Sequence, residues 1–248
     1  MKQPKIVLLD IETSPLTTYT WSPFDDNALK ILEFSKIISV AYKDLYSKDI
    51  TCKALCDYKG YKKGQLDDEK LVREIWKVLD EADIVIAHHG DRFDLPKLNA
   101  RFVYYGLTAP STYKSIDTKK IASKHFKFDS NSLNNLSAYL NLGAKAETGG
   151  FSLWDKCIQG DKDAWQKMKE YNIYDVILLE KVYLTLRPFM ENHPNLNLIA
   201  GLNDLACHTC QSVNIVKQGF KITVTGKKQR YQCKDCGAWS TGKFEKNK

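Results

Sequence analysis

The sequence predicts an α/β fold in which helices flank one mixed sheet, followed by a small β-rich module at the C-terminus. Short apolar runs typical of buried strands cluster before residue 90, whereas helical spacing prevails from Ser115 onward. Four of the seven cysteines form two close pairs within the last 42 residues, which indicates a separate unit held by a metal ion. The 248 residues suffice for one well-filled domain and a small appendage.

Most of the expected strands lie in the first third of the chain. They are predicted because each is short, apolar and rich in β-branched residues, and they cover 6–11, 37–42, 50–55 and 83–88. A loop rich in Thr, Ser and Pro is expected from Thr13 to about Asn27. In the C-terminal module, residues 213–225 alternate in the manner of a strand and 226–228 suit a turn.

Helices are expected where apolar residues recur every three or four positions. The predicted ranges are 66–80, 94–105, 118–125, 132–140, 163–168 and 169–186. Pro188 and Pro194 then interrupt the helical pattern. We therefore expect a first domain over 1–193, a linker over 194–206 and the cysteine module over 207–248.

No apolar run is long enough to span a bilayer, so no membrane partner is expected. The apolar stretch before Asp10 is too short for the core of a signal peptide. The sequence therefore predicts a cytoplasmic protein, or one of the host cytoplasm if a phage encodes it.

The net charge of +7 is concentrated at the C-terminus. Residues 207–248 contain nine Lys or Arg and two acidic residues, whereas the other 206 residues contain 28 basic and 28 acidic ones. Such a basic module favours a polyanionic partner, and nucleic acid is the expected one. The alternative is a solvated tail that only improves solubility.

The cysteine spacing predicts a structural zinc site. Cys207 and Cys210 form one Cys-x-x-Cys pair, Cys233 and Cys236 form another, and 22 residues separate the two pairs. Two such pairs suit one tetrahedral Zn²⁺ with four thiolate ligands, and a β-hairpin would fill the interval. A closed site of this kind leaves no open position for a substrate.

Carboxylates occur at three places that would suit a metal-dependent phosphodiesterase. Such enzymes need clustered carboxylates that hold two divalent cations about 4 Å apart. Asp10 and Glu12 are two residues apart on a strand, so their side chains leave the same face. Asp94 starts a predicted helix, and Tyr171 and Asp175 are four residues apart on another. Each signal also has a plainer explanation: a solvated strand end, a helix N-cap and a surface pair.

The order of these motifs resembles that of the DEDD exonucleases, the DnaQ-like superfamily with a ribonuclease H-like fold. Residues 8–13 (LLDIET) are similar to the first motif of that family, and Phe93-Asp94 to the second. Residues 171–175 resemble the third motif in the Tyr-x-x-x-Asp form of the DEDDy branch. The similarity spans roughly residues 5 to 190.

The resemblance implies a 3′→5′ exonuclease that uses two Mg²⁺ or Mn²⁺ ions on single-stranded 3′ ends, with DNA favoured over RNA. Asp10, Glu12 and Asp175 would hold the ion that activates water, Asp10 would also contact the second ion, and Asp94 would bind that second ion. Tyr171 would orient or help to deprotonate the attacking water. His89 and Phe93 would contact the substrate, and His89 stands where family members commonly have Asn.

Residues 229–237 resemble zinc ribbons of transposases and other DNA-acting proteins. The side chains expected to contact phosphates and bases are Lys227, Lys228, Arg230 and Tyr231. Because some zinc ribbons bind proteins, a protein partner of this module stays open. A polymerase or another replication or repair protein acting in trans is a further candidate partner.

Two alternative functions remain. A transposase-like or resolvase-like endonuclease can share both the fold and the ribbon, but the Asp-x-Glu start and the Tyr-x-x-x-Asp finish argue against it. A catalytically inactive nucleic-acid-binding adaptor would not require the intact set of four acids and one tyrosine.

Overall fold

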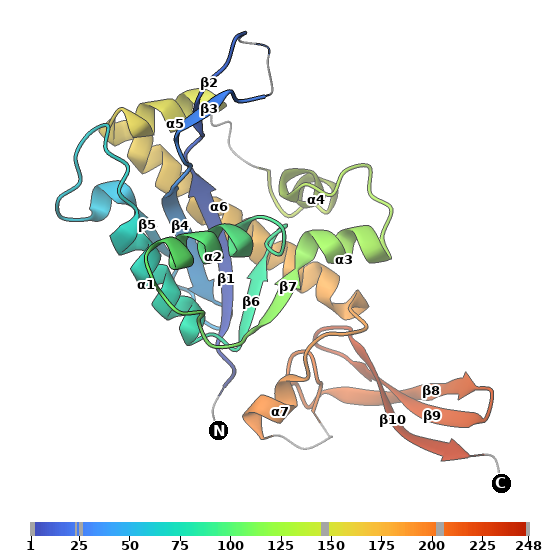
Figure 1. The fold of residues 1–248 in the computed structure, drawn as a ribbon. Coiled ribbons are helices and arrows are strands. Elements are labelled where there is room, and N and C mark those ends of the chain that lie inside the picture. Colours follow the sequence, from blue (N-terminus) through green and yellow to red (C-terminus); the bar gives the residue numbers. More distant parts are fainter. Residues whose placement is uncertain (1–2, 23, 25–26, 145–148, 202–205, 247–248) are drawn as a thin grey trace.

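A computed structural model describes residues 3–22, 24, 27–144, 149–201 and 206–246, without the side chains of 244–246 (Figure 1). Its five-stranded sheet has the order β5-β4-β1-β6-β7. The bounds are β1 (Ile6–Thr13), β4 (Ile37–Asp44), β5 (Thr51–Ala54), β6 (Ile84–Ala87) and β7 (Lys114–Asp117). Strand β1 pairs parallel with β6 and antiparallel with β4, so the prediction of a mixed sheet is confirmed.

Helices cover both faces of this sheet, as Figure 1 shows. Their bounds are α1 (Glu69–Asp80), α2 (Asp94–Tyr104), α3 (Thr118–His125), α4 (Leu133–Tyr139), α5 (Phe151–Ile158) and α6 (Lys162–Leu186), with short 3-10 turns at Leu55–Asp57 and Arg187–Phe189. One core cluster joins the sheet to α1, α2 and α5, and the other joins it to α3, α4 and the C-terminal half of α6. No described helix is both long enough and apolar enough to cross a membrane.

The residues of β1 alternate between these two clusters. Val7, Leu9 and Ile11 pack on the side of α1 and α2. Ile6 and Leu8 pack on the side of α6. Because successive side chains of a strand point to opposite faces, Asp10 and Glu12 continue the series that faces α6.

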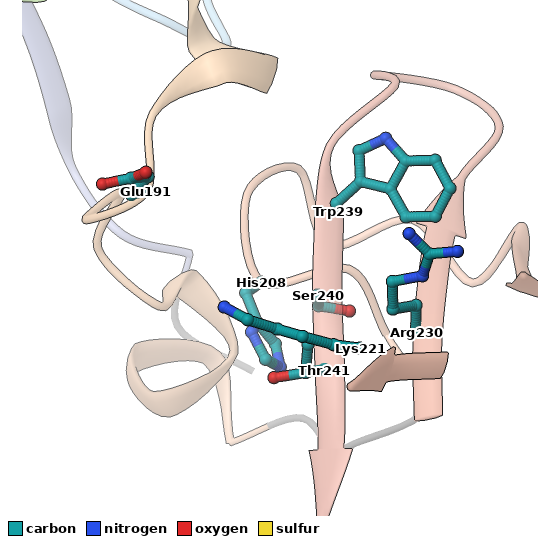
Figure 2. Close-up of a pocket in the computed structure, with 7 residues that line it drawn as sticks. All are labelled: Glu191, His208, Lys221, Arg230, Trp239, Ser240 and Thr241. Atoms are coloured by element: carbon teal, nitrogen blue, oxygen red, sulfur yellow. The ribbon is translucent and has the colours of Figure 1, made fainter. Parts of the chain in front are cut away.

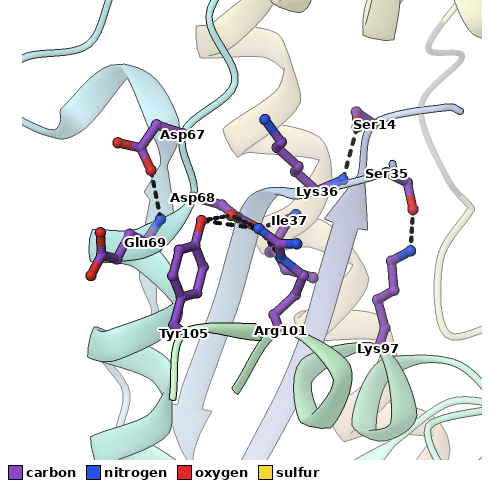
Figure 3. Close-up of polar contacts among 10 residues, drawn as sticks. All are labelled: Ser14, Ser35, Lys36, Ile37, Asp67, Asp68, Glu69, Lys97, Arg101 and Tyr105. Atoms are coloured by element: carbon purple, nitrogen blue, oxygen red, sulfur yellow. Dashed lines mark hydrogen bonds and ion pairs between the residues drawn. The ribbon is translucent and has the colours of Figure 1, made fainter. Parts of the chain in front are cut away.

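A buried ion pair fixes α2 against α1 and β4 (Figure 3). The Asp68 side chain is fully buried and accepts hydrogen bonds from Arg101 Nε at 2.9 Å and Tyr105 Oη at 2.6 Å. It also accepts one from the backbone N–H of Ile37 at 2.9 Å, where β4 begins. Since a buried charge is costly unless it is paired and hydrogen-bonded, these contacts define the position of α2, which begins at Asp94.

Several element predictions were wrong. The expected helices 163–168 and 169–186 are the single helix α6, whose buried face passes from one core cluster at Met168 to the other at Val176. This change of packing partner breaks the apolar pattern without breaking the helix. Helix α5 was not predicted because it is short and interrupts a polar stretch. Strand β7 was also not predicted, because it has only four residues and lies where the helical spacing begins.

The loop expected from Thr13 to about Asn27 contains part of a small hairpin. This hairpin consists of β2 (Thr17–Tyr19) paired antiparallel with β3 (Lys30–Glu33). Both strands are short and mainly exposed, so they lack the apolar signal of a core strand. Residues 23, 25 and 26 of this predicted loop lie outside the described residues.

The C-terminal module is a three-stranded antiparallel sheet of order β10-β9-β8. It comprises β8 (Ile215–Thr223), β9 (Gly226–Cys233) and β10 (Trp239–Lys246). The turn predicted at 226–228 is wrong, because Gly226 already pairs with Thr223 and the turn consists of Val224 and Thr225. The predicted linker contains α7 (Leu196–Ala200), whose Leu196 is buried in the core beside α6, and residues 202–205 of that linker lie outside the described residues.

Candidate active site

The structure brings three of the four predicted carboxylates together. Asp10, Glu12 and Asp175 each place a carboxylate oxygen within 4.8 Å of the other two. Asp175 is 3% exposed, whereas the other two are half-buried. Carboxylates this close repel one another, and a divalent cation between them would reverse that repulsion. The donor set consists of hard oxygen ligands, which suit Mg²⁺ or Mn²⁺.

The fold explains why these three residues meet. Asp10 and Glu12 lie on the face of β1 that α6 covers, and Asp175 is buried in the middle of α6. The C-terminal half of α6 packs on Ile6 and Leu8, the two apolar residues that precede Asp10 on the same face. The position of α6 on β1 therefore places Asp175 against the strand end.

Asn172 is a site residue that sequence reasoning missed. Its side chain is fully buried, and its Nδ2 donates to Asp10 Oδ2 at 2.6 Å and to the Asp10 carbonyl at 3.3 Å. Its Oδ1 accepts from Ser39 Oγ at 2.8 Å, and Ser39 lies opposite Glu12 on β4. Asn172 therefore orients the Asp10 carboxylate. The sequence feature that could have identified Asn172 is its position three residues before Asp175, on the same side of the helix.

Asp94 lies beside the cluster but is not one of its three members. The plainer explanation of Asp94 as an N-cap does not hold, because Phe93 has the N-cap position and Asp94 is the first helical residue. Asp94 Oδ1 instead accepts from the backbone N–H of Ile11 at 3.2 Å, between the two acids of β1. Burial raises the pKa of Asp94 well above its ordinary value, and the charge of Asp117 raises it further.

Tyr171 lies one helical turn before Asp175 on α6. Its ring is partly buried and packs edge-on against Trp154 of α5, with 6.0 Å between ring centroids. Phe93 is 44% exposed at the start of α2 and is therefore accessible to a ligand.

His89 occupies a turn that few residue types tolerate. Its φ of 68° lies in the left-handed region, which His and Asn adopt more readily than most residues. Its backbone N–H donates to Asp117 Oδ1 at 3.0 Å, the same oxygen that caps α3. At the adjacent Gly90, any side chain would collide with Ala87.

The four predicted cysteines form a second candidate metal site. The Sγ atoms of Cys207 and Cys236 are 3.7 Å apart, and those of Cys210 and Cys233 are 3.6 Å apart. A tetrahedral site with metal–sulfur bonds of about 2.3 Å has sulfur–sulfur edges of roughly 3.8 Å, so these distances fit a tetrathiolate site. The hydrogen bond between the Cys207 and Cys210 thiols lowers the pKa of Cys207 and raises that of Cys210, and a bound metal ion would replace the proton that the two sulfurs share.

The remaining predicted residues, Lys227, Lys228, Arg230 and Tyr231, all lie on β9. In Figure 1 this strand lies beyond the end of the five-stranded sheet at which β1, β6 and β7 begin. Asp10 and Glu12 lie in the C-terminal half of β1. These four residues therefore belong to a surface separate from the carboxylates.

Comparison with known proteins indicates the family and the fold. A protein-family model described as the RNase H superfamily matches residues 35–187, which include α6 but not β1. No curated protein matches the sequence. The structure is similar to that of a family B DNA polymerase from the hyperthermophilic archaeon Pyrobaculum calidifontis, with a TM-score of 0.55 and 15% identity. The similarity covers 76% of this chain and 25% of the polymerase, so it concerns the fold of one part of a much larger protein.

The contact between Asn172 and Asp10 predicts a loss of metal affinity when the amide is removed. Asn172→Ala should weaken Mn²⁺ binding about 10-fold to 100-fold, because outer contacts of this kind orient metal ligands. Isothermal titration calorimetry with Mn²⁺ measures this change. Asn197→Ala is the matched control, since Asn197 is also buried but donates to the Ala206 carbonyl. Equal Mn²⁺ affinity in the two variants would exclude a positioning role for Asn172.

Proposed function

The chain belongs to the RNase H superfamily with a ribonuclease H-like fold, and on that premise we propose that it is a metal-dependent 3′→5′ exonuclease of the DEDDy type. The proposed substrate is single-stranded nucleic acid, with DNA favoured over RNA. The observation that carries the proposal is the convergence of Asp10, Glu12 and Asp175 within 4.8 Å. The ribonuclease H-like fold supports a nuclease, and the order of the three motifs supports the exonuclease type.

The proposed chemistry is hydrolysis of the terminal phosphodiester bond. Two bound Mg²⁺ or Mn²⁺ ions would activate the attacking water and stabilise the leaving oxygen. Asp10, Glu12 and Asp175 would hold the first ion, and Asp94 would hold the second together with Asp10. The bond between Asp94 Oδ1 and the Ile11 N–H supports this division, because it keeps Asp94 next to β1.

The other residues of the site have positioning and binding roles in this proposal. Asn172 keeps the Asp10 carboxylate directed at the cluster. Tyr171, which packs against Trp154 one helical turn before Asp175, would orient the attacking water. Phe93 and His89 would contact the terminal nucleotide, Phe93 through its exposed ring. Phe93 lies next to Asp94 at the start of α2, and its backbone N–H donates to the His89 carbonyl at 3.0 Å, which supports this role.

We further propose that residues 207–248 form a zinc ribbon that holds the substrate. Four thiolates at tetrahedral spacing favour Zn²⁺ over harder cations. The two kinds of metal ion would have different functions, because the thiolate site is closed and structural, whereas two of the three carboxylates at the other site are partly exposed. In this proposal the nuclease domain is 1–193, and 194–206 connects it to the ribbon.

The exonuclease proposal predicts that replacing the Asp175 carboxylate with a carboxamide greatly slows cleavage. Asp175→Asn should lower the hydrolysis rate by more than about 100-fold, because it removes a carboxylate charge that would hold the catalytic metal ion. The assay uses 5′-labelled single-stranded DNA and RNA with Mg²⁺ or Mn²⁺. The wild-type protein should give a ladder that shortens from the 3′ end. Asp163→Asn is the control, since it makes the same change at an exposed position on α6.

Equal rates for Asp175→Asn and Asp163→Asn would contradict the assignment of the carboxylate cluster. Cleavage of covalently closed circular DNA would favour the endonuclease alternative instead. Binding without cleavage of any strand would favour the adaptor.

The zinc proposal predicts one Zn²⁺ per chain. Cys210→Ser should lose this zinc and unfold the ribbon, since a module of this size has too little core without its metal. Cys56→Ser should retain the zinc, because Cys56 is half-buried like Cys210 but lies outside the four-cysteine cluster. Plasma mass spectrometry of the purified variants measures the zinc content. Full zinc content in Cys210→Ser would contradict the assignment.

A further inference from the structure

The strands of the ribbon divide its basic residues between two faces. On β9, Lys228, Arg230 and Gln232 point to one face, whereas Lys227, Gln229 and Tyr231 point to the other, because side chains alternate along a strand. Paired residues on adjacent strands share a face. Lys221 pairs with Lys228, and Trp239 pairs with Gln232, so both belong to the first face.

Side-chain contacts agree with this division. The Arg230 guanidinium carbon lies 5.4 Å from the ring centroid of Trp239, on the first face. Lys227 Nζ lies 4.4 Å from the ring centroid of Phe220, on the second face. Tyr231 belongs to that second face, with its ring next to Gly242. The basic side chains that the sequence places in one run are therefore separated in space.

Lys221, Arg230 and Trp239 of the first face line a cavity between the ribbon and the segment that follows α6. This cavity of about 610 Å³ is lined by Lys221, Arg230, Trp239 and Thr241 of the sheet, with Ser240, His208 and Glu191. Figure 2 shows Trp239, Arg230 and Lys221 on the ribbon side and Glu191 across from them. Trp239 is 51% exposed, so its ring is available for stacking.

A second hollow adjoins this cavity at Glu191. This hollow lies along β7 and α3, and its lining includes Lys114, Lys120, Lys124 and Asp117. Lys120 and Lys124 pair with Asp91 and Glu191, but both lysine side chains are more than half exposed. Such surface pairs contribute little in water, so phosphates can replace the carboxylates. Asp117, which also lines this hollow, accepts a hydrogen bond from the backbone N–H of His89 at 3.0 Å.

We propose that the ribbon face formed by Lys221, Lys228, Arg230 and Trp239 binds the upstream part of the single-stranded substrate, which then follows the lysines of α3 toward the carboxylates. Lys221, Lys228 and Arg230 contact phosphates, and Trp239 stacks on a base. This inference rests on the proposed nuclease function for the identity of the strand. It assigns Lys227 and Tyr231, expected from the sequence to contact nucleic acid, to the face away from the substrate.

The test compares identical substitutions on the two faces. Lys221→Glu and Lys217→Glu change exposed residues of β8, and Lys217 pairs with Tyr231 of the second face. Binding of a fluorescent 30-nucleotide DNA strand is measured by anisotropy without Mg²⁺ or Mn²⁺. Lys221→Glu should weaken binding about 10-fold and flatten its salt dependence, and Lys217→Glu should change it less than about twofold. Trp239→Leu should weaken binding about 5-fold to 100-fold, and Tyr231→Leu should not.

Equal losses for Lys221→Glu and Lys217→Glu, or no loss in either, would overturn the assignment of the face. Zinc content in each variant confirms that the ribbon is folded. Hydrolysis of a 6-nucleotide strand, which leaves few nucleotides to contact the ribbon, separates the two proposals. If the wild-type protein does not cleave that strand, the exonuclease proposal fails, whereas the difference between the two faces in binding is measured independently.

Discussion

The candidate active site depends on the packing of α6 across β1 and β4. Apolar contacts join the C-terminal half of α6 to Ile6 and Leu8. Polar contacts fix it at both ends: Glu180 binds Lys43 of β4 at 2.7 Å, and Trp165 Nε1 donates to Tyr61 Oη at 3.0 Å. Between these anchors, Asn172 and Asp175 meet the carboxyl end of β1. A shift of α6 along the sheet would separate Asp175 from Asp10 and Glu12.

This packing holds carboxylates together that would otherwise repel one another. Asn172 offsets part of this electrostatic repulsion by donating a hydrogen bond to Asp10, and the Ile11 N–H donates one to Asp94. The Asp68–Arg101 pair acts at a greater distance, since it fixes α2 and therefore Asp94. The polar contacts around the site thus keep its acids in place, and a bound cation would offset the repulsion that remains between the carboxylates.

The sequence predicted the parts of the site that depend on local spacing. The shared face of Asp10 and Glu12 follows from strand periodicity, and the cysteine cluster follows from two Cys-x-x-Cys pairs. Asn172 could not be assigned, because its role depends on which strand α6 covers. The hairpin of β2 and β3 is mainly exposed and β7 is too short, so neither gave a clear pattern. The sequence also did not show which side chains share a face of the ribbon. A bulge at Gln218–Gly219, with Gly219 at a φ of 62°, shifts the alternation of side chains along β8.

The measurement that tests the central claim most directly is anomalous diffraction from crystals of the full chain grown with Mn²⁺. Data collected at the manganese and zinc edges distinguish the two metals and locate each one. The account predicts a manganese peak between the carboxylates of Asp10, Glu12 and Asp175, and a zinc peak among the four cysteines. Zinc at the cysteines without manganese at the carboxylates, at saturating Mn²⁺, would contradict the claim that these acids form a catalytic metal site.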